Sequence, residues 1–345
     1  MRVYADYYDK FKCKCGDCRH VCCGGWGITV SDGEYFRLLG LDCPPELRSS
    51  LDVALAMVDD PSPERFAVMK PSYTGKCRLI NDAGLCSLQI ACGEEVLPAV
   101  CRTYPRSITD THAGCSASCE RVVELLMKDE PLSFSAPLPE PLASYVYSLR
   151  PLCGQLPRKG SPAEASFFDG GGATGRSDGR SLRERIASLL PDVFPHGQTC
   201  SYFSLLGAYI ENLSAVFASF SETVYEEYKA YAAVPDGEER LYNDISGFNR
   251  RFPAADLWLE NLIINRAFIS DFPGDDIKPA LCGLVCEYAL LRFVSAKCET
   301  EERFVDKISS LYRFIGHTNF NKNSAAALNR AGAYSAEGLS ALLIL

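Results

Sequence analysis

Apolar residues recur at three- and four-residue steps through the second half of the chain. This spacing is typical of helices with one buried face, and it covers residues 181–190, 201–233, 256–272, 281–296 and 304–316. The stretch at 281–296 is apolar almost throughout, but Glu287 and Arg292 interrupt it, and it is shorter than the roughly 20 residues that span a bilayer. We therefore expect a helical C-terminal domain over 181–345, with a buried helix near 281–296 and no membrane span.

The first 130 residues have a different pattern, in which short apolar runs are broken by glycine, proline and cysteine. Residues 131–180 are rich in proline, glycine and serine, as connecting segments are. The pattern predicts a mainly α protein in three parts. These are a cysteine-rich, metal-binding region of short helices and loops (1–130), a linker or mobile loop (131–180) and the helical domain (181–345).

Composition narrows the class of protein. With 345 residues, 47% of them hydrophobic and 23% charged, the chain can bury an ordinary core. Its net charge of −9 would repel a phosphate backbone, so we expect no nucleic-acid partner. The N-terminus has no apolar segment of the kind that a secretory signal carries, which favours the reducing cytoplasm. Cysteines that cluster in that compartment indicate metal binding or catalysis rather than disulfides.

Most of the 17 cysteines precede residue 120, and five lie in the stretch CKCGDCRHVCC at 13–23. Sites built mainly of thiolates hold zinc or an iron–sulfur cluster. The order Cys15-x2-Cys18-x3-Cys22 is the reverse of the C-x3-C-x2-C signature of radical S-adenosylmethionine enzymes, and Gly25 stands where that signature would need a cysteine. Val21 likewise excludes the C-x2-C-x2-C run of bacterial ferredoxins. Spacing leaves zinc and iron–sulfur both open.

Further cysteines follow this stretch. Cys77 and Cys86 flank a turn at NDAG that would bring the two sulfurs together as in a hairpin. Cys101 ends a short predicted helix, and Cys119 precedes another helical stretch. We expect these four to join the first cluster across the fold, with His112 as a candidate nitrogen ligand.

These residues carry a family resemblance. FKCKCGDCRHVCCGGWGITVSD, CRLINDAGLCSLQ, GEEVLPAVCRTYPR, SCERVVELL and LENLIINRAFISDFP occur in this order along the chain. Together they resemble the flagellin lysine-N-methylase family, which is itself similar to small cysteine-rich proteins that chelate zinc or iron.

The resemblance implies transfer of methyl groups from S-adenosylmethionine to lysines of flagellin or a similar protein, with a 4Fe-4S cluster involved. The implied metal ligands are Cys13, Cys18, Cys22, Cys23, Cys77, Cys86, Cys101 and Cys119. The cysteines at 15, 43, 92 and 115 are extra to the family pattern.

Methyl transfer to lysine requires a neutral amine, and the reference pKa of lysine is about 10.4. The lysine ammonium must therefore lose a proton, which requires either a nearby base or a desolvated site that favours the neutral amine. The candidates near the cysteines are Asp17, His20, Tyr104 and Asp110, although a surface or turn-stabilising role suits each of them better.

Cofactor contacts are expected from three residues. Trp26 could line the site, and Arg102 and Arg106 could pair with a carboxylate or with the negative charge of a thiolate-bound cluster. The glycine-rich loop at 167–175 resembles a methyltransferase cofactor loop, but no buried strand precedes it and helices follow it, so we interpret it as linker.

The leading hypothesis is an iron–sulfur-dependent protein lysine N-methyltransferase. The alternatives are a zinc-stabilised binding or scaffold protein and an iron–sulfur redox or metal-handling protein without transferase activity. Cys282 and Cys286, four residues apart on the apolar 281–296 stretch, are expected to be buried structural residues.

Overall fold

The computed structural model describes residues 2–19, 22–24, 27–73, 75–138, 181–215, 220, 224–316 and 318–344. The chain forms two compact units. The larger unit consists of Met1–Phe11, Ile108–Ser118 and Val122–Leu345, and the smaller unit of Lys12–Ser107 and Cys119–Arg121. The proposed linker loop at 167–175 and most of the segment 131–180 lie outside the described residues.

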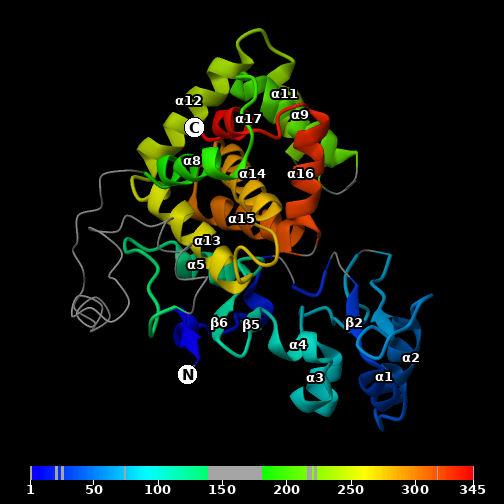
Figure 1. The fold of residues 1–345 in the computed structure, drawn as a ribbon. Helices are drawn as coiled ribbons and strands as arrows, with labels where there is room; N and C mark the ends of the chain where they lie inside the picture. The colour runs from blue at the N-terminus through cyan, green and yellow to red at the C-terminus, as the bar shows by residue number, and fades with distance from the viewer. Residues whose placement is uncertain are drawn as a thin grey trace. The chain divides into compact units, whose positions relative to one another are not determined.

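Helices make up most of the larger unit (Figure 1). They are α5 (Glu120–Leu126, whose first residues belong to the smaller unit), α8 (Leu182–Val193), α9 (Tyr202–Ser214), α11 (Glu226–Ala232), α12 (Gly237–Arg251), α13 (Ala255–Ile269), α14 (Ile277–Ser295), α15 (Glu301–Gly316), α16 (Phe320–Arg330) and α17 (Ala336–Ala341). The periodic stretches of the sequence thus fold as the helices that they predict, and the fold is mainly α.

Helix α14 forms the centre of this unit. Every residue from Ala280 to Ser295 is buried, and the helix packs against α8, α12, α13, α15, α16 and α17. Asp276 caps its N-terminus by accepting a hydrogen bond from the backbone N–H of Lys278 at 3.1 Å. No helix in the described part of the chain is long and apolar enough to cross a membrane.

The polar residues of α13 attach the first and middle parts of the chain to the helices. Asn261 accepts a hydrogen bond from the backbone N–H of Leu132 at 2.6 Å and donates to the carbonyls of Leu126 and Glu130. Asn265 donates to the carbonyl of Cys115 at 3.0 Å. These contacts explain why the stretch ENLIINRAF contains buried side-chain amides. Each amide forms hydrogen bonds with backbone N–H or C=O groups that have no partner in a helix or sheet.

The larger unit also contains a small sheet of order β1-β6-β5, made of β1 (Val3–Tyr4), β6 (His112–Cys115) and β5 (Arg106–Ile108). Strand β1 runs parallel to β6. Strand β5 contains residues of both units.

The smaller unit combines short helices with a second sheet. Antiparallel strands have the order β2-β4-β3, namely β2 (Ile28–Val30), β4 (Ala67–Met69) and β3 (Leu55–Met57). The helices are α1 (Asp32–Leu39), α2 (Pro45–Ala54), α3 (Ser87–Cys92) and α4 (Ala99–Thr103). The sequence predicts only short helices and loops here, so the strands are a correction. At two to four residues each, the strands of both sheets are too short to produce an alternating pattern.

Candidate functional site

The smaller unit contains all eight cysteines that the family resemblance selects. Its apolar core is formed by α1, α2, α3 and the β2-β4-β3 sheet, and Cys77, Cys86 and Cys101 are half-buried against that core. These three thiols therefore lie at the edge of a packed structure.

Backbone contacts bring the two cysteine-rich stretches together. The N–H of Cys77 donates to the carbonyl of Cys23 at 2.7 Å. Gly16 lies so close to the NDAG turn that a Cβ at this position would come within 2.9 Å of the carbonyl oxygen of Ala83. Any larger residue at position 16 would push the CKCGDC stretch away from the turn. This close approach explains why glycine occupies position 16, and the spacing of the cysteines in the sequence does not reveal it.

The NDAG turn forms as the sequence predicts. The side chain of Asn81 accepts hydrogen bonds from the N–H groups of Ala83 and Leu85, both at 3.0 Å. Gly84 has a φ of 74°, which favours glycine. An antiparallel bridge between Ile80 and Cys86 closes the turn.

One group of thiols lies around this junction. The Sγ atoms of Cys22 and Cys23 are 3.8 Å apart. Burial first, and then the charges of Cys77, Cys86 and Cys22, together raise the pKa of Cys101 to about 12. The pKa of Cys77 is also raised, first by burial and then by Cys86 and Cys22. These mutual effects join five thiols into one group, which we call the core thiol group: Cys22, Cys23, Cys77, Cys86 and Cys101.

A second group lies near Glu120. Burial raises the pKa of Cys18 to about 12, with smaller contributions from the charges of Glu120, Cys119 and Cys13. The buried Glu120 carboxylate accepts a hydrogen bond from the N–H of Arg19 at 3.2 Å, and Lys14 lies 3.6 Å from it. The cysteines at 13, 18 and 119 form this second group, which adjoins the core thiol group, since the pKa of Cys13 is raised first by burial and also by the charge of Cys22.

Most of the four cysteines that are extra to the family pattern lie apart from the two thiol groups. Cys92 lies near Cys43. The pKa of Cys92 is raised mainly by desolvation and also by the charge of Cys43. Cys115 is buried in the larger unit, where its N–H donates to the hydroxyl of Tyr7 at 2.8 Å. Cys15 lies next to Cys13, and its own N–H approaches the Cys13 sulfur at 3.3 Å.

The donor set suits a soft metal, since thiolates bind zinc and iron–sulfur clusters. Among the residues that the structure describes, no group of three or more cysteine, histidine or acidic side chains closes around a single point. His112 is buried in the larger unit, where its Nδ1 lies 2.9 Å from Thr111 Oγ1 and 3.1 Å from Thr109 Oγ1.

The described candidate catalytic residues are divided between the two units. Asp17 ends an exposed 3₁₀ turn, and Tyr104 follows α4 in the smaller unit. Asp110 is exposed in the larger unit. His20 and Trp26 lie outside the described residues.

The candidate cofactor residues differ in their surroundings. Arg102 is exposed and lies 3.9 Å from the carboxylate of Glu95, so it forms an ion pair with a surface acid. Arg106 is half-buried on β5. Glu34 was not expected from the sequence, yet it joins α1 to α4 by accepting the N–H of Ala99 at 2.6 Å, two residues before Cys101.

Comparison with known proteins identifies the helical segment. Residues 182–342, just under half of the chain, match the model of the FliB lysine N-methylase C-terminal domain. The chain carries a FliB lysine N-methylase C-terminal domain. This domain supplies α8 to α17 of the larger unit, and the family resemblance inferred from separated motifs is confirmed for it.

Curated relatives are distant. The chain is 22% identical over 127 residues to the lysine-N-methylase of Salmonella typhimurium, which covers 36% of this chain and 31% of that protein. It is 22% identical over 123 residues to the flagellar biosynthetic protein FliU of Salmonella muenchen, covering 34% of this chain and 72% of that protein. The chain spans about a third of the length of the Salmonella typhimurium relative that it matches. No solved structure matches it significantly.

Proposed function

We propose that this protein is an S-adenosylmethionine-dependent protein lysine N-methyltransferase that acts on flagellin or a similar protein in the cytoplasm. The observation that carries the proposal is the FliB lysine N-methylase C-terminal domain at 182–342. The names of the relatives, a lysine-N-methylase and a flagellar biosynthetic protein, support the reaction and the substrate class.

The proposal includes an iron–sulfur cluster in the smaller unit. The core thiol group has one thiol more than the four that a 4Fe-4S cluster uses, and the second group adds Cys13, Cys18 and Cys119. A bound cluster would supply a Lewis-acidic iron or a route for electrons. The protein's own contribution is to hold these thiols against a packed core, where Glu34 fixes the helix that carries Cys101.

The first experiment is anaerobic purification followed by iron, sulfide and zinc analysis and an absorption spectrum. We expect about four irons with matching acid-labile sulfide and a brown protein. The loaded protein is then incubated with S-adenosylmethionine and flagellin, and methyl-lysine is measured by mass spectrometry. Stoichiometric zinc in a colourless protein without methyl transfer would favour the scaffold alternative, and iron without methyl transfer the redox alternative.

Substitutions distinguish ligands from structural cysteines. We expect Cys22→Ser and Cys18→Ser to lose metal. Cys43→Ser, in the same unit but outside both thiol groups, and Cys282→Ser, buried in α14, should keep it. Equal metal loss in all four variants would contradict this division of the cysteines.

A further inference from the structure

A surface groove of about 340 Å³ lies within the larger unit, where α17 meets the end of α8 and the loop that follows it. Its walls are largely apolar and include Pro191, Ala336 and Ile344. An apolar groove of this size can enclose one long side chain with its neighbouring backbone. The groove belongs to the FliB C-terminal domain and uses none of the cysteines discussed above.

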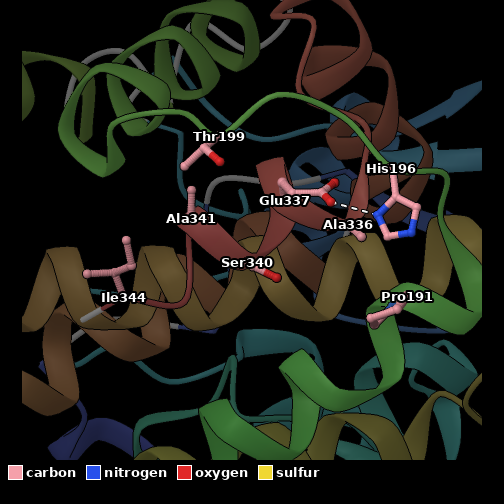
Figure 2. Close-up of a pocket in the computed structure, with 8 residues that line it drawn as sticks. All are labelled: Pro191, His196, Thr199, Ala336, Glu337, Ser340, Ala341 and Ile344. Atoms are coloured by element: carbon pink, nitrogen blue, oxygen red, sulfur yellow. Dashed lines mark hydrogen bonds and ion pairs between the residues drawn. The ribbon is translucent and has the colours of Figure 1, made fainter.

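A histidine and a carboxylate face each other in this groove, as Figure 2 shows. Nδ1 of His196 lies 2.8 Å from Oε1 of Glu337, and the N–H of Gly197 donates to Oε2 at 2.6 Å. The hydrogen bond from His196, followed by that from Gly197, lowers the pKa of Glu337, so this carboxylate is ionised at neutral pH.

The pair leaves one ring nitrogen of His196 available. When Nδ1–H donates to a carboxylate, the neutral ring carries its lone pair on Nε2, which is then a hydrogen-bond acceptor and a base. The side chain of His196 is 86% exposed, so a ligand in the groove can reach it. The groove thus combines apolar walls, one fixed negative charge and one accessible base.

We propose that this groove binds the side chain of the substrate lysine, with Glu337 as counter-ion and His196 as proton acceptor. The apolar walls suit the aliphatic stem of lysine. The Glu337 carboxylate and the overall charge of −9 attract its ammonium group. The inference rests on the proposed function for the identity of the methyl donor.

The proton transfer and the methyl transfer balance as follows. The ammonium gives a proton to Nε2 of His196, and the resulting imidazolium is stabilised by Glu337. The free electron pair of the amine attacks the methyl carbon of the sulfonium donor, so a C–N bond forms as the C–S bond breaks. The neutral thioether leaves, and His196 returns its proton to water.

A second acidic groove offers a comparison. It lies at the start of α12 and includes Asp236, Glu238 and Glu239. Asp236 already pairs with Arg240 at 2.8 Å, so its charge has a partner on the same surface. Its lining residues include carboxylates but no histidine, so this groove lacks the histidine–carboxylate pair of the first groove. It provides a matched control.

The test uses a short single-lysine peptide and the same peptide with norleucine in place of lysine. Binding to the full-length protein is measured by calorimetry, and methyl transfer with S-adenosylmethionine gives kcat and KM. Glu337→Gln should weaken lysine-peptide binding and raise KM about 10-fold, as loss of a charge-assisted contact does, without changing norleucine-peptide binding. Glu239→Gln, which removes the same charge from the other groove, should change neither.

The base role has its own measurement. His196→Ala should lower kcat by about 100-fold while KM changes little, and added imidazole should restore part of kcat. Thr199→Trp fills the groove without removing the His196–Glu337 contact, and it should abolish lysine-peptide binding. Thermal melts of each variant identify any that fail to fold.

The outcomes separate this inference from the proposed function. Normal lysine-peptide binding and normal kcat in both Glu337→Gln and Thr199→Trp would overturn the groove while methyl transfer stands. Lysine-specific binding that depends on Glu337, in a metal-loaded protein that transfers no methyl group, would support the groove and refute the proposed reaction.

Discussion

At the scale of single residues, the largest effect on stability is expected at the buried charge pair between α13 and α14. Nη1 of Arg266 lies 2.6 Å from Oε2 of Glu287, and the hydroxyl of Tyr312 donates to Oε1 at 2.5 Å. Arg266→Met leaves the Glu287 carboxylate buried without its counter-ion. We expect the free energy of unfolding to fall by about 3–5 kcal/mol, measured by denaturant titration.

The pH dependence of this loss checks its cause. Burial raises the pKa of Glu287, and Arg266 and Tyr312 lower it in part. Arg266→Met should raise it further, and a raised folded-state pKa costs stability as pH rises. The deficit should therefore be small below the reference pKa of about 4.3 and grow with pH. The double variant Arg266→Met/Glu287→Leu should recover most of the loss; an equal deficit in the double variant would show that packing, not charge, is responsible.

Another residue-scale effect is expected at Asn265, which completes the hydrogen bonds of Tyr7 and of the Cys115 carbonyl. Asn265→Leu removes one partner from each buried group, while the Tyr7 hydroxyl still donates to the Cys115 carbonyl at 3.0 Å, so we expect a loss of about 0.5–1.5 kcal/mol for each bond removed. A thermal melt should register the loss. Tyr7→Phe in the same background should cost less than it does in the wild type, because the bond to Asn265 is already absent while the two bonds to Cys115 remain to be lost; a fully additive loss would contradict this coupling.

At the scale of elements, the capping box of α1 also positions the cysteine helix α4. Glu34 accepts the N–H of Ser31 at 2.9 Å and that of Ala99 at 2.6 Å. Glu34→Ala should cost about 1 kcal/mol as a lost cap and should also lower metal content through Cys101. Glu184→Ala breaks the same capping box at α8, where no thiol group lies, and should cost similar stability without metal loss.

The pH dependence of the Glu34 cap follows from its hydrogen bonds. Desolvation alone would raise the pKa of Glu34, but the N–H groups of Ser31 and Ala99 outweigh it, and the pKa is lowered. Its stabilisation is therefore present above the unfolded pKa of about 4.3 and is lost as pH falls through the folded value. The stability difference between wild type and Glu34→Ala should shrink on acidification; a constant difference would exclude the charged cap as its source.

The elements also show what the sequence could and could not predict. The long helices were predictable because burying one face imposes apolar spacing, as at Leu241, Ile245 and Phe248 of α12. Asn243 and Asp244 are residue types that often cap helices, yet both lie inside α12. The His196–Glu337 pair joins residues 141 positions apart and has no sequence signal. The turn between Cys77 and Cys86 was predictable from the NDAG sequence, whereas the close approach of Gly16 to Ala83 has no signal in the sequence.

At the scale of the whole molecule, the two units differ in what stabilises them. The larger unit has its own apolar core around α14, where hydrophobic burial supplies the stability. The core of the smaller unit includes half-buried cysteines at its edge, so a metal held by those thiols would contribute directly to its folding. Loss of metal should therefore weaken the smaller unit selectively.

Hydrogen exchange with mass spectrometry, with and without an anaerobic chelator, measures this difference. Chelation should reduce amide protection in β2, β4, α3 and α4. Burial and the neighbouring thiols both disfavour thiolates in the core thiol group, and without a metal ion nothing offsets this cost. Protection of α13 and α14 should stay unchanged, and Cys22→Ser should reproduce the chelated pattern without chelator. Equal loss of protection in α14 would mean that the metal stabilises the entire chain. Unchanged protection in every element would mean that the metal does not contribute to the stability of the fold.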